Sequence, residues 1–356
     1  MIVAFVNHVG SNTRKVEGHM SKTTPIDIFD ILYGLCSQDG REAALFGDSI
    51  ALVRPVIEKC IIGDKYPLFY VEFPLKGTPC FDVLTVHGEI PPDTKFAPGC
   101  GFGYQAMYDW FSNLPSGHRT SCAIEMDTGG GETERAGVYF QFRDKTELIA
   151  PFLKSVGEEK RLSSYMETFR RFPEGMPPAY IGLFPGREGS PMRIGGYMYD
   201  KLIREIAERP ALLGECFDSI GFSAYDENML EFCREIFAPA RGIDFQFDIY
   251  PDGSLGDVFG LSFSFNEIFP RQAEECMSSG TGAEFMTMLE NRGLADDRWK
   301  MIAGATLGKG IPFERSDGNF GILAMVISFN FAKIKFRAGK AMSAKFYLTM
   351  CARELV

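Results

Sequence analysis

The chain of 356 residues has 37 basic and 47 acidic side chains, a formal net charge of −10, and 45% hydrophobic residues. This composition is that of a globular protein with a sizeable core, and its negative charge excludes a general nucleic-acid binder, because neutralising phosphates requires a basic surface. The nine cysteines include no C-x-x-C pair and the four histidines are scattered, so we expect no disulfides, no structural zinc site and no Ser-His-Asp triad.

The N-terminal segment, residues 1–65, begins with an apolar stretch that lacks the basic region of a signal peptide. No stretch of the chain approaches the ~18 apolar residues of a membrane span, so we expect a soluble cytoplasmic protein without membrane contact. A helical pattern at 26–35 precedes an apolar stretch at 44–62. We expect this segment to pack on a single barrel domain that covers residues 1–356.

From residue 67 to 350 the chain repeats one pattern five times: two strand-like runs joined by a turn, followed by helical runs. The paired runs are 68–73 and 80–88, 121–127 and 136–142, 179–184 and 192–199, 243–250 and 258–265, and 323–336 and 342–350. The helical runs are 104–114, 145–171, 201–217, 226–237 and 271–301. Five such hairpins can form an open antiparallel sheet or a closed ten-stranded barrel. We predict closure, because it removes the edge strands.

Apolar and polar residues alternate along these runs, as in strands that separate two environments. The polar face includes Tyr70, Glu72, Tyr139, Gln141, Arg143, Tyr180, Arg193, Tyr197, Asp244, Ser262, Lys345 and Tyr347. We expect helices to cover the apolar face and the polar face to line a common interior. A sheet with one solvated face would show the same alternation, but a face rich in tyrosine is more typical of a concave pocket.

With these hairpins and interior residues, the chain resembles the αββα prenyltransferases. The resemblance implies an α+β fold in which a ten-stranded antiparallel barrel is surrounded by helices and holds the active site in its lumen. In that family, K-x-Y and R-x-K-x-Y motifs lie on the second strand of successive hairpins. Their cations bind an allylic diphosphate, and their tyrosines shield the allyl cation.

Lys345 and Tyr347 fit K-x-Y, and Arg193 and Tyr197 fit the outer positions of R-x-K-x-Y. Glycine stands where lysine is expected at Gly195 and at Gly137, the latter ahead of Tyr139. Glu72 resembles the acid that accepts a proton from the aromatic acceptor or orients it, so the resemblance implies a catalytic role for Glu72. It implies substrate binding by Arg193, Tyr139, Tyr197, Lys345, Tyr347, Arg143 and Tyr180.

The implied function is transfer of a prenyl group from its diphosphate to an aromatic small molecule or a peptide side chain, as in peptide modification or natural-product biosynthesis. Ionising the diphosphate creates a cation and an anionic leaving group, which tyrosine faces and cationic side chains stabilise respectively. No tightly bound cofactor is expected. The interior acids, Glu72, Glu125, Asp127, Asp244 and Asp248, outnumber the expected cations, so Mg²⁺ bridging the diphosphate is an additional expectation.

Two other functions fit the same barrel. An acidic interior also attracts a cationic side chain or amine, so a non-prenyl enzyme that modifies a peptide or amine is one alternative. A barrel that binds a hydrophobic ligand or peptide without catalysis is the other. The basic run 333–340 is interpreted as a solvated rim at the turn of the fifth hairpin, and the protein is expected to be a monomer or homodimer.

Overall fold

The computed structural model describes residues 25–60, 68–87, 104–115, 121–126, 137–184, 189–240, 242–265, 270–314 and 319–355. The strands are β1 (Leu68–Pro74), β2 (Asp82–His87), β3 (Ser121–Met126), β4 (Gly137–Gln141), β5 (Pro178–Leu183), β6 (Met192–Met198), β7 (Ile243–Ile249), β8 (Leu255–Ser264), β9 (Leu307–Glu314), β10 (Phe320–Arg337) and β11 (Lys340–Leu355). The α-helices are α1 (Pro25–Cys36), α2 (Ile50–Cys60), α3 (Tyr104–Ser112), α4 (Ile149–Ser155), α5 (Leu162–Phe169), α6 (Asp200–Glu208), α7 (Ala211–Ile220), α8 (Glu227–Phe237), α9 (Pro270–Ser278) and α10 (Thr281–Asn291). Shorter helical segments are η3 (Glu42–Phe46), η6 (Thr146–Leu148), η7 (Glu159–Arg161), η8 (Asp297–Met301) and η9 (Ala303–Ala305).

Ten of the described strands close into an antiparallel barrel. They follow the order β1-β2-β3-β4-β5-β6-β7-β8-β10-β11, and β11 pairs back with β1. The eleventh strand, β9, is attached outside this ring to β10. The predicted closed barrel with helices is therefore confirmed, and the alternative of an open sheet with one solvated face is wrong.

Strand β9 is an element that the sequence did not predict. It contains Gly308, Gly310 and Pro312, residues that disfavour strands, and it lies at the edge of the sheet, where proline is tolerated. It pairs with the first half of β10, while the second half of β10 pairs with β8. A register shift between Phe329 and Phe331 separates the two halves, so one long strand serves both the barrel and its extension.

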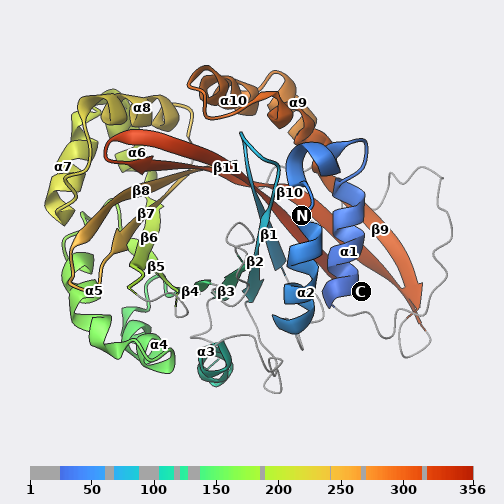
Figure 1. The fold of residues 1–356 in the computed structure, drawn as a ribbon, viewed down its shortest axis with the longest axis horizontal. Helices are drawn as coiled ribbons and strands as arrows, with labels where there is room; N and C mark the ends of the chain where they lie inside the picture. Colours follow the sequence, from blue (N-terminus) through green and yellow to red (C-terminus); the bar gives the residue numbers. More distant parts are fainter. Residues whose placement is uncertain are drawn as a thin grey trace.

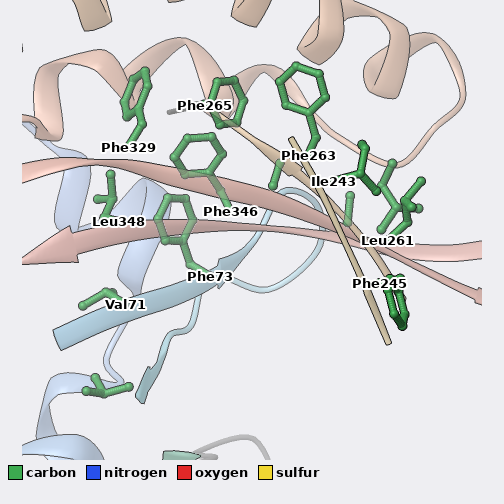
Figure 2. Close-up of a cluster of buried hydrophobic side chains, with 14 of the residues drawn as sticks. Val71, Phe73, Ile243, Phe245, Leu261, Phe263, Phe265, Phe329, Phe346 and Leu348 are labelled. Carbon is green, nitrogen blue, oxygen red and sulfur yellow. The ribbon is translucent and has the colours of Figure 1, made fainter. Parts of the chain in front are cut away.

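The apolar face of the barrel packs against the surrounding helices, as expected from the alternation. Helices α4 to α8 lie along one side, α9 contacts β10 and carries α10 beside it, and α1 contacts β10 and β11 and carries α2 beside it (Figure 1). Figure 2 shows part of the resulting core, with Val71, Phe73, Ile243, Phe245, Leu261, Phe263, Phe265, Phe329, Phe346 and Leu348 buried together. Burying a side chain of this size stabilises a fold by roughly 1.5–3 kcal/mol.

Three predicted helical runs are interrupted in the structure, and one of them, 271–301, divides into α9 and α10 at residues 279–280. The run 145–171 divides into α4 and α5 around Gly157, which has a positive φ of 73° that favours glycine. The run 201–217 divides at Pro210, because proline cannot donate the hydrogen bond that continues a helix. These breaks let successive helices follow the curvature of the barrel (Figure 1).

The segment expected to pack on the barrel is described in part. Helix α1 contacts β10 and β11, whereas residues 1–24 and 61–67 lie outside the described residues. No helix in the described ranges has the length and apolar character that crossing a membrane requires.

Candidate active site in the barrel lumen

The polar face of the strands lines the lumen, which contains a cavity of about 350 Å³. Five tyrosines on different strands contribute to its wall: Tyr70, Tyr139, Tyr180, Tyr197 and Tyr347. Apolar side chains, including Leu84, Val86 and Phe331, complete that wall. The ring of Phe331 stacks on Tyr347, with centroids 4.0 Å apart. A cavity of this kind suits a ligand with an aromatic or apolar body and few polar groups.

Charged side chains gather toward the hairpin-turn end of the lumen. Here lie the acids Asp82, Glu125 and Asp248 and the bases Arg193, Lys335 and Lys345, all near strand ends that lead into hairpins. The tyrosine-rich cavity adjoins this end, and Glu125 also lines the cavity. The barrel therefore has a charged end and an aromatic end.

Glu72, the expected catalytic acid, is buried in the wall of the cavity. Tyr347, its register partner on β11, donates a hydrogen bond to Glu72 Oε2, and the Lys345 ammonium donates to Glu72 Oε1. Lys345 Nζ also lies 3.4 Å from Asp82 Oδ2. Burial raises the pKa of Glu72, while the positive charge of Lys345 opposes this rise. The carboxylate is thus oriented by two donors and faces the cavity.

Arg193 is the centre of a second charged network. Its Nε donates to Asp248 Oδ1 at 3.2 Å, and its Nη1 donates to the Tyr139 hydroxyl at 2.5 Å. That hydroxyl donates to Glu125 Oε2 at 2.5 Å. Burial alone would raise the pKa of Glu125, but Arg193 and the Tyr139 hydrogen bond lower it overall, so Glu125 is an anion paired with a guanidinium.

The two glycines at expected lysine positions face space that aromatic rings fill. A Cβ added at Gly195 would lie 2.1 Å from Cζ of Tyr180. A Cβ added at Gly137 would lie 2.8 Å from Cε1 of Phe184, whose ring stacks under the Arg193 guanidinium at 4.7 Å. Aromatic side chains therefore occupy the two places where the resemblance implied cations.

Lys333 is a lumen residue that the sequence analysis missed. It lines the cavity, pairs across the strands with Lys345, and donates to Gln246 Oε1 at 2.5 Å. Burial and the charge of Arg193 lower its pKa. The interpretation of run 333–340 as a solvated rim is therefore wrong for Lys333, although Lys335 is exposed at the charged end. The alternation of both lysines with Ile334 was the signal that could have placed Lys333 inside.

Most of the predicted site residues come together in the lumen. Glu72, Tyr139, Tyr180, Tyr197 and Tyr347 line the cavity, and Arg193 and Lys345 hydrogen-bond to side chains in its wall. Tyr197 is 44% exposed and accepts a hydrogen bond from Gln141 at 2.6 Å, which places it at the edge of the cavity.

Arg143 does not extend the strand as expected. Strand β4 ends at Gln141, and Arg143 lies in the following turn with φ of 54° and an exposed side chain. Asp127, which was expected among the interior acids, lies outside the described residues.

Asp244 is a cavity residue with a marked electrostatic property. The Tyr180 hydroxyl donates to its Oδ1 at 3.2 Å. Burial raises its pKa from 3.8 to about 7, while Lys333 and the Tyr180 hydrogen bond pull in the opposite direction. Its charge therefore changes near neutral pH.

Within the described ranges no group of three or more His, Cys, Asp or Glu side chains is placed to hold a metal ion. Glu72 and Asp82 share the Lys345 ammonium. These residues do not form a ready protein site for Mg²⁺.

No protein-family model matches the chain, and no curated protein matches it in sequence. Solved structures do: 5-dimethylallyltryptophan synthase from Streptomyces coelicolor has a TM-score of 0.51 at 10% identity, over 92% of this chain and 97% of that one. The same synthase in complex with DMASPP and Trp has a TM-score of 0.49 at 12% identity, over 92% and 95%. AnaPT from Neosartorya fischeri has 0.46 at 12% identity, over 92% of both chains. Together with the closed barrel of ten strands, the first of these likenesses shows that the chain has the αββα prenyltransferase fold.

Proposed function

We propose that this protein transfers a prenyl group from an allylic diphosphate to an aromatic acceptor, a small molecule or a peptide side chain, inside the barrel. The observation that carries the proposal is the position of Glu72: a buried carboxylate of raised pKa, held by Tyr347 and Lys345 at the wall of a tyrosine-lined cavity. The αββα fold supports it.

The proposed reaction has two events. The allylic C–O bond breaks, and its electron pair leaves with the diphosphate. A ring carbon of the acceptor supplies the electron pair of the new C–C bond, and the proton on that carbon passes to Glu72. The tyrosine rings shield the allyl cation from water, each contact contributing roughly 0.5–2 kcal/mol.

The leaving group would face the charged end of the lumen. Arg193, Lys335 and Lys345 are the cations at this end, and Lys333 lines the adjoining cavity. Because Gly137 and Gly195 bring no cation, the lysines of β10 and β11 take a larger share of this role than the resemblance implied. In this proposal Mg²⁺ acts only as a counter-ion of the diphosphate. Removing Mg²⁺ with EDTA tests whether it is needed.

A second candidate function is chemistry on, or binding of, an amine or peptide without a prenyl donor. The observation that favours it is the pair of glycines whose neighbouring space is filled by Tyr180 and Phe184. The lumen of the described structure has five acids, Glu72, Asp82, Glu125, Asp244 and Asp248, against four cations. Such a lumen attracts a cation at least as readily as a diphosphate.

Binding and turnover test the first proposal separately. The melting temperature is measured with dimethylallyl or geranyl diphosphate at near-millimolar concentration, with Mg²⁺ or with EDTA, and a rise is expected because ligands that bind the native state stabilise it. Turnover is measured as diphosphate release and as acceptor mass, with tryptophan, tyrosine and peptides containing them. We expect Glu72→Gln to retain the thermal shift and to lose at least about 100-fold in turnover.

Glu208→Gln, on the exposed surface of α6, is the matched control and should keep full turnover. Absence of any thermal shift with both diphosphates, in both metal conditions, would refute prenyl transfer. Full turnover in Glu72→Gln would refute the role of Glu72.

A further inference from the structure

The charges on the cavity wall are unequal. Among the described residues that line the cavity, Glu72, Glu125 and Asp244 are acidic, and Lys333 is basic. Glu72 is neutralised by Lys345, and Glu125 by Arg193. Asp244 forms no ion pair within the described part of the chain, and its hydrogen bond comes from the uncharged Tyr180 hydroxyl.

The register of the strands explains why Asp244 lacks a cation. Its partners across the strands are Tyr197 on β6 and Ser262 on β8, and Ser262 in turn pairs with Lys333 on β10. Asp244 and Lys333 are thus two strands apart, roughly 10 Å between Cα atoms. The Lys333 ammonium donates instead to Gln246, at 2.5 Å. The Lys333 ammonium is therefore bonded to Gln246 and not to Asp244, although its charge is close enough to oppose the rise in the pKa of Asp244.

The surroundings of Asp244 suit a small organic cation. Tyr197 on β6 is its register partner, Tyr180 on β5 lies on the same side of β7, and the cavity beside them measures about 350 Å³. A carboxylate accepts strong hydrogen bonds from an ammonium group, and tyrosine rings add cation–π attraction. The same position would repel a carboxylate ligand.

We propose that Asp244 is the recognition site for a positively charged amine on the molecule that occupies the cavity. A primary or methylated amine attached to an aromatic or apolar body matches the carboxylate, the tyrosines and the apolar wall together. That this molecule is the acceptor rests on the proposed prenyl transfer, whereas the amine site itself does not.

Three probes that share a phenyl ring and differ in charge test this site: 2-phenylethylamine, 2-phenylethanol and 3-phenylpropionate. Binding is measured by calorimetry at pH 8, where Asp244 is ionised. We expect the amine to bind at least about tenfold more tightly than the alcohol, and the carboxylate to bind most weakly. In Asp244→Asn, an isosteric change, the affinity for the amine should fall to that for the alcohol, and the affinity for the alcohol should not change.

Asp200→Asn, at the exposed start of α6, is the control and should bind all three probes as the wild type does. Equal affinities of the wild type for amine and alcohol, or no amine binding at millimolar concentration, would overturn the inference even if Asp244→Asn failed to fold. An amine preference that survives in Asp244→Asn would overturn it as well. The thermal shift with prenyl diphosphates is read independently, so failure of the amine site and failure of prenyl transfer are distinguishable.

Discussion

Asp244 differs from the other lumen acids in the group that it contacts. The other four share two cations, Lys345 and Arg193, whereas Asp244 has the hydroxyl of Tyr180. Enclosure in the protein disfavours the charged form of a carboxylate that has no ion pair, and this raises the pKa of Asp244 to about 7. Near neutral pH, this one side chain changes the charge of the cavity.

The same property predicts how stability depends on pH. Because the pKa of Asp244 is higher in the folded protein than its ordinary value of 3.8, the folded state binds the proton more tightly. Its contribution to the free energy of unfolding is therefore complete below about pH 4 and is lost as the pH rises to about 7. About three pKa units correspond to about 4 kcal/mol. Asp244→Asn, which cannot ionise, should lose this slope and be more stable than the wild type at pH 8.

Urea denaturation between pH 4 and pH 8 measures this difference. Glu72, whose pKa is also raised by burial, contributes a slope of the same sign to both proteins, so the comparison isolates Asp244. Asp200→Asn should follow the wild type throughout. Parallel curves for Asp244→Asn and the wild type would contradict the assignment.

At the residue scale, the alternation of apolar and polar residues predicted which side chains face the lumen, but only within the strands. Glu72 and Tyr139 face the lumen as the alternation requires. Lys333 also faces the lumen, as its alternation with the buried Ile334 on β10 requires, whereas the interpretation of 333–340 as a solvated rim placed it outside. Arg143 was placed inside because Phe142, before it, is apolar and buried, although the strand has already ended. Hydrogen-bond partners such as Lys345 and Glu72, which are far apart in the chain, have no signal in one sequence.

At the scale of elements, strands β5 and β6 fit together because one of two facing residues, Gly195 on β6, has no side chain. Gly195 is the register partner of Tyr180, whose ring lies over it and whose hydroxyl reaches Asp244. Gly195 thus gives the Tyr180 ring its place in the lumen. Gly195 departs from the family motif, and the absence of a side chain there is what allows the Tyr180 ring to occupy this position.

Gly195→Ala should consequently disturb the strand pair. Its Cβ would lie 2.1 Å from Cζ of Tyr180, so the ring must move, and overpacking of this kind costs about 1–3 kcal/mol. Tyr180→Ala in the same chain removes the clash, so the cost of Gly195→Ala should nearly vanish in the double variant. A double-mutant cycle of urea denaturation measures the coupling.

Gly34→Ala is a matched control for the glycine replacement. A Cβ at this exposed position of α1 meets nothing within 4 Å, and alanine favours a helix over glycine, so stability should rise by up to about 1 kcal/mol. Additive effects of Gly195→Ala and Tyr180→Ala would show that the ring does not depend on the glycine.

The elements themselves follow from the sequence to different degrees. The five barrel hairpins were predictable because turn residues separate runs of period two. Strand β9 was not predictable, because its glycines and proline are not typical of a strand. Its pairing with β10 depends on tertiary contacts. The helix breaks at Gly157 and Pro210 have local causes, because the glycine and the proline that interrupt the helices are visible in the sequence.

At the scale of the whole molecule, both the chain and the described lumen carry more acidic than basic side chains. The chain has a net charge of −10, and the described lumen has five acids against four cations. Long-range forces therefore oppose the approach of an anion and favour that of a cation. An enzyme whose field attracts its diphosphate substrate would have the opposite balance.

This balance predicts opposite salt effects for the two ligands. Raising the salt concentration from about 20 to about 200 mM shortens the screening length from roughly 20 to roughly 7 Å, so distant charges cease to act. Association of dimethylallyl diphosphate should become faster, on the order of two- to fivefold, while association of 2-phenylethylamine should become slower by a similar factor. Stopped-flow rates with each ligand measure both effects, and 2-phenylethanol, which is uncharged, is the control and should not respond. Slower association of the diphosphate with added salt would contradict this prediction. It would mean that the lysines at the charged end of the lumen outweigh the net charge of the molecule, so that the lumen attracts anions despite its five acids.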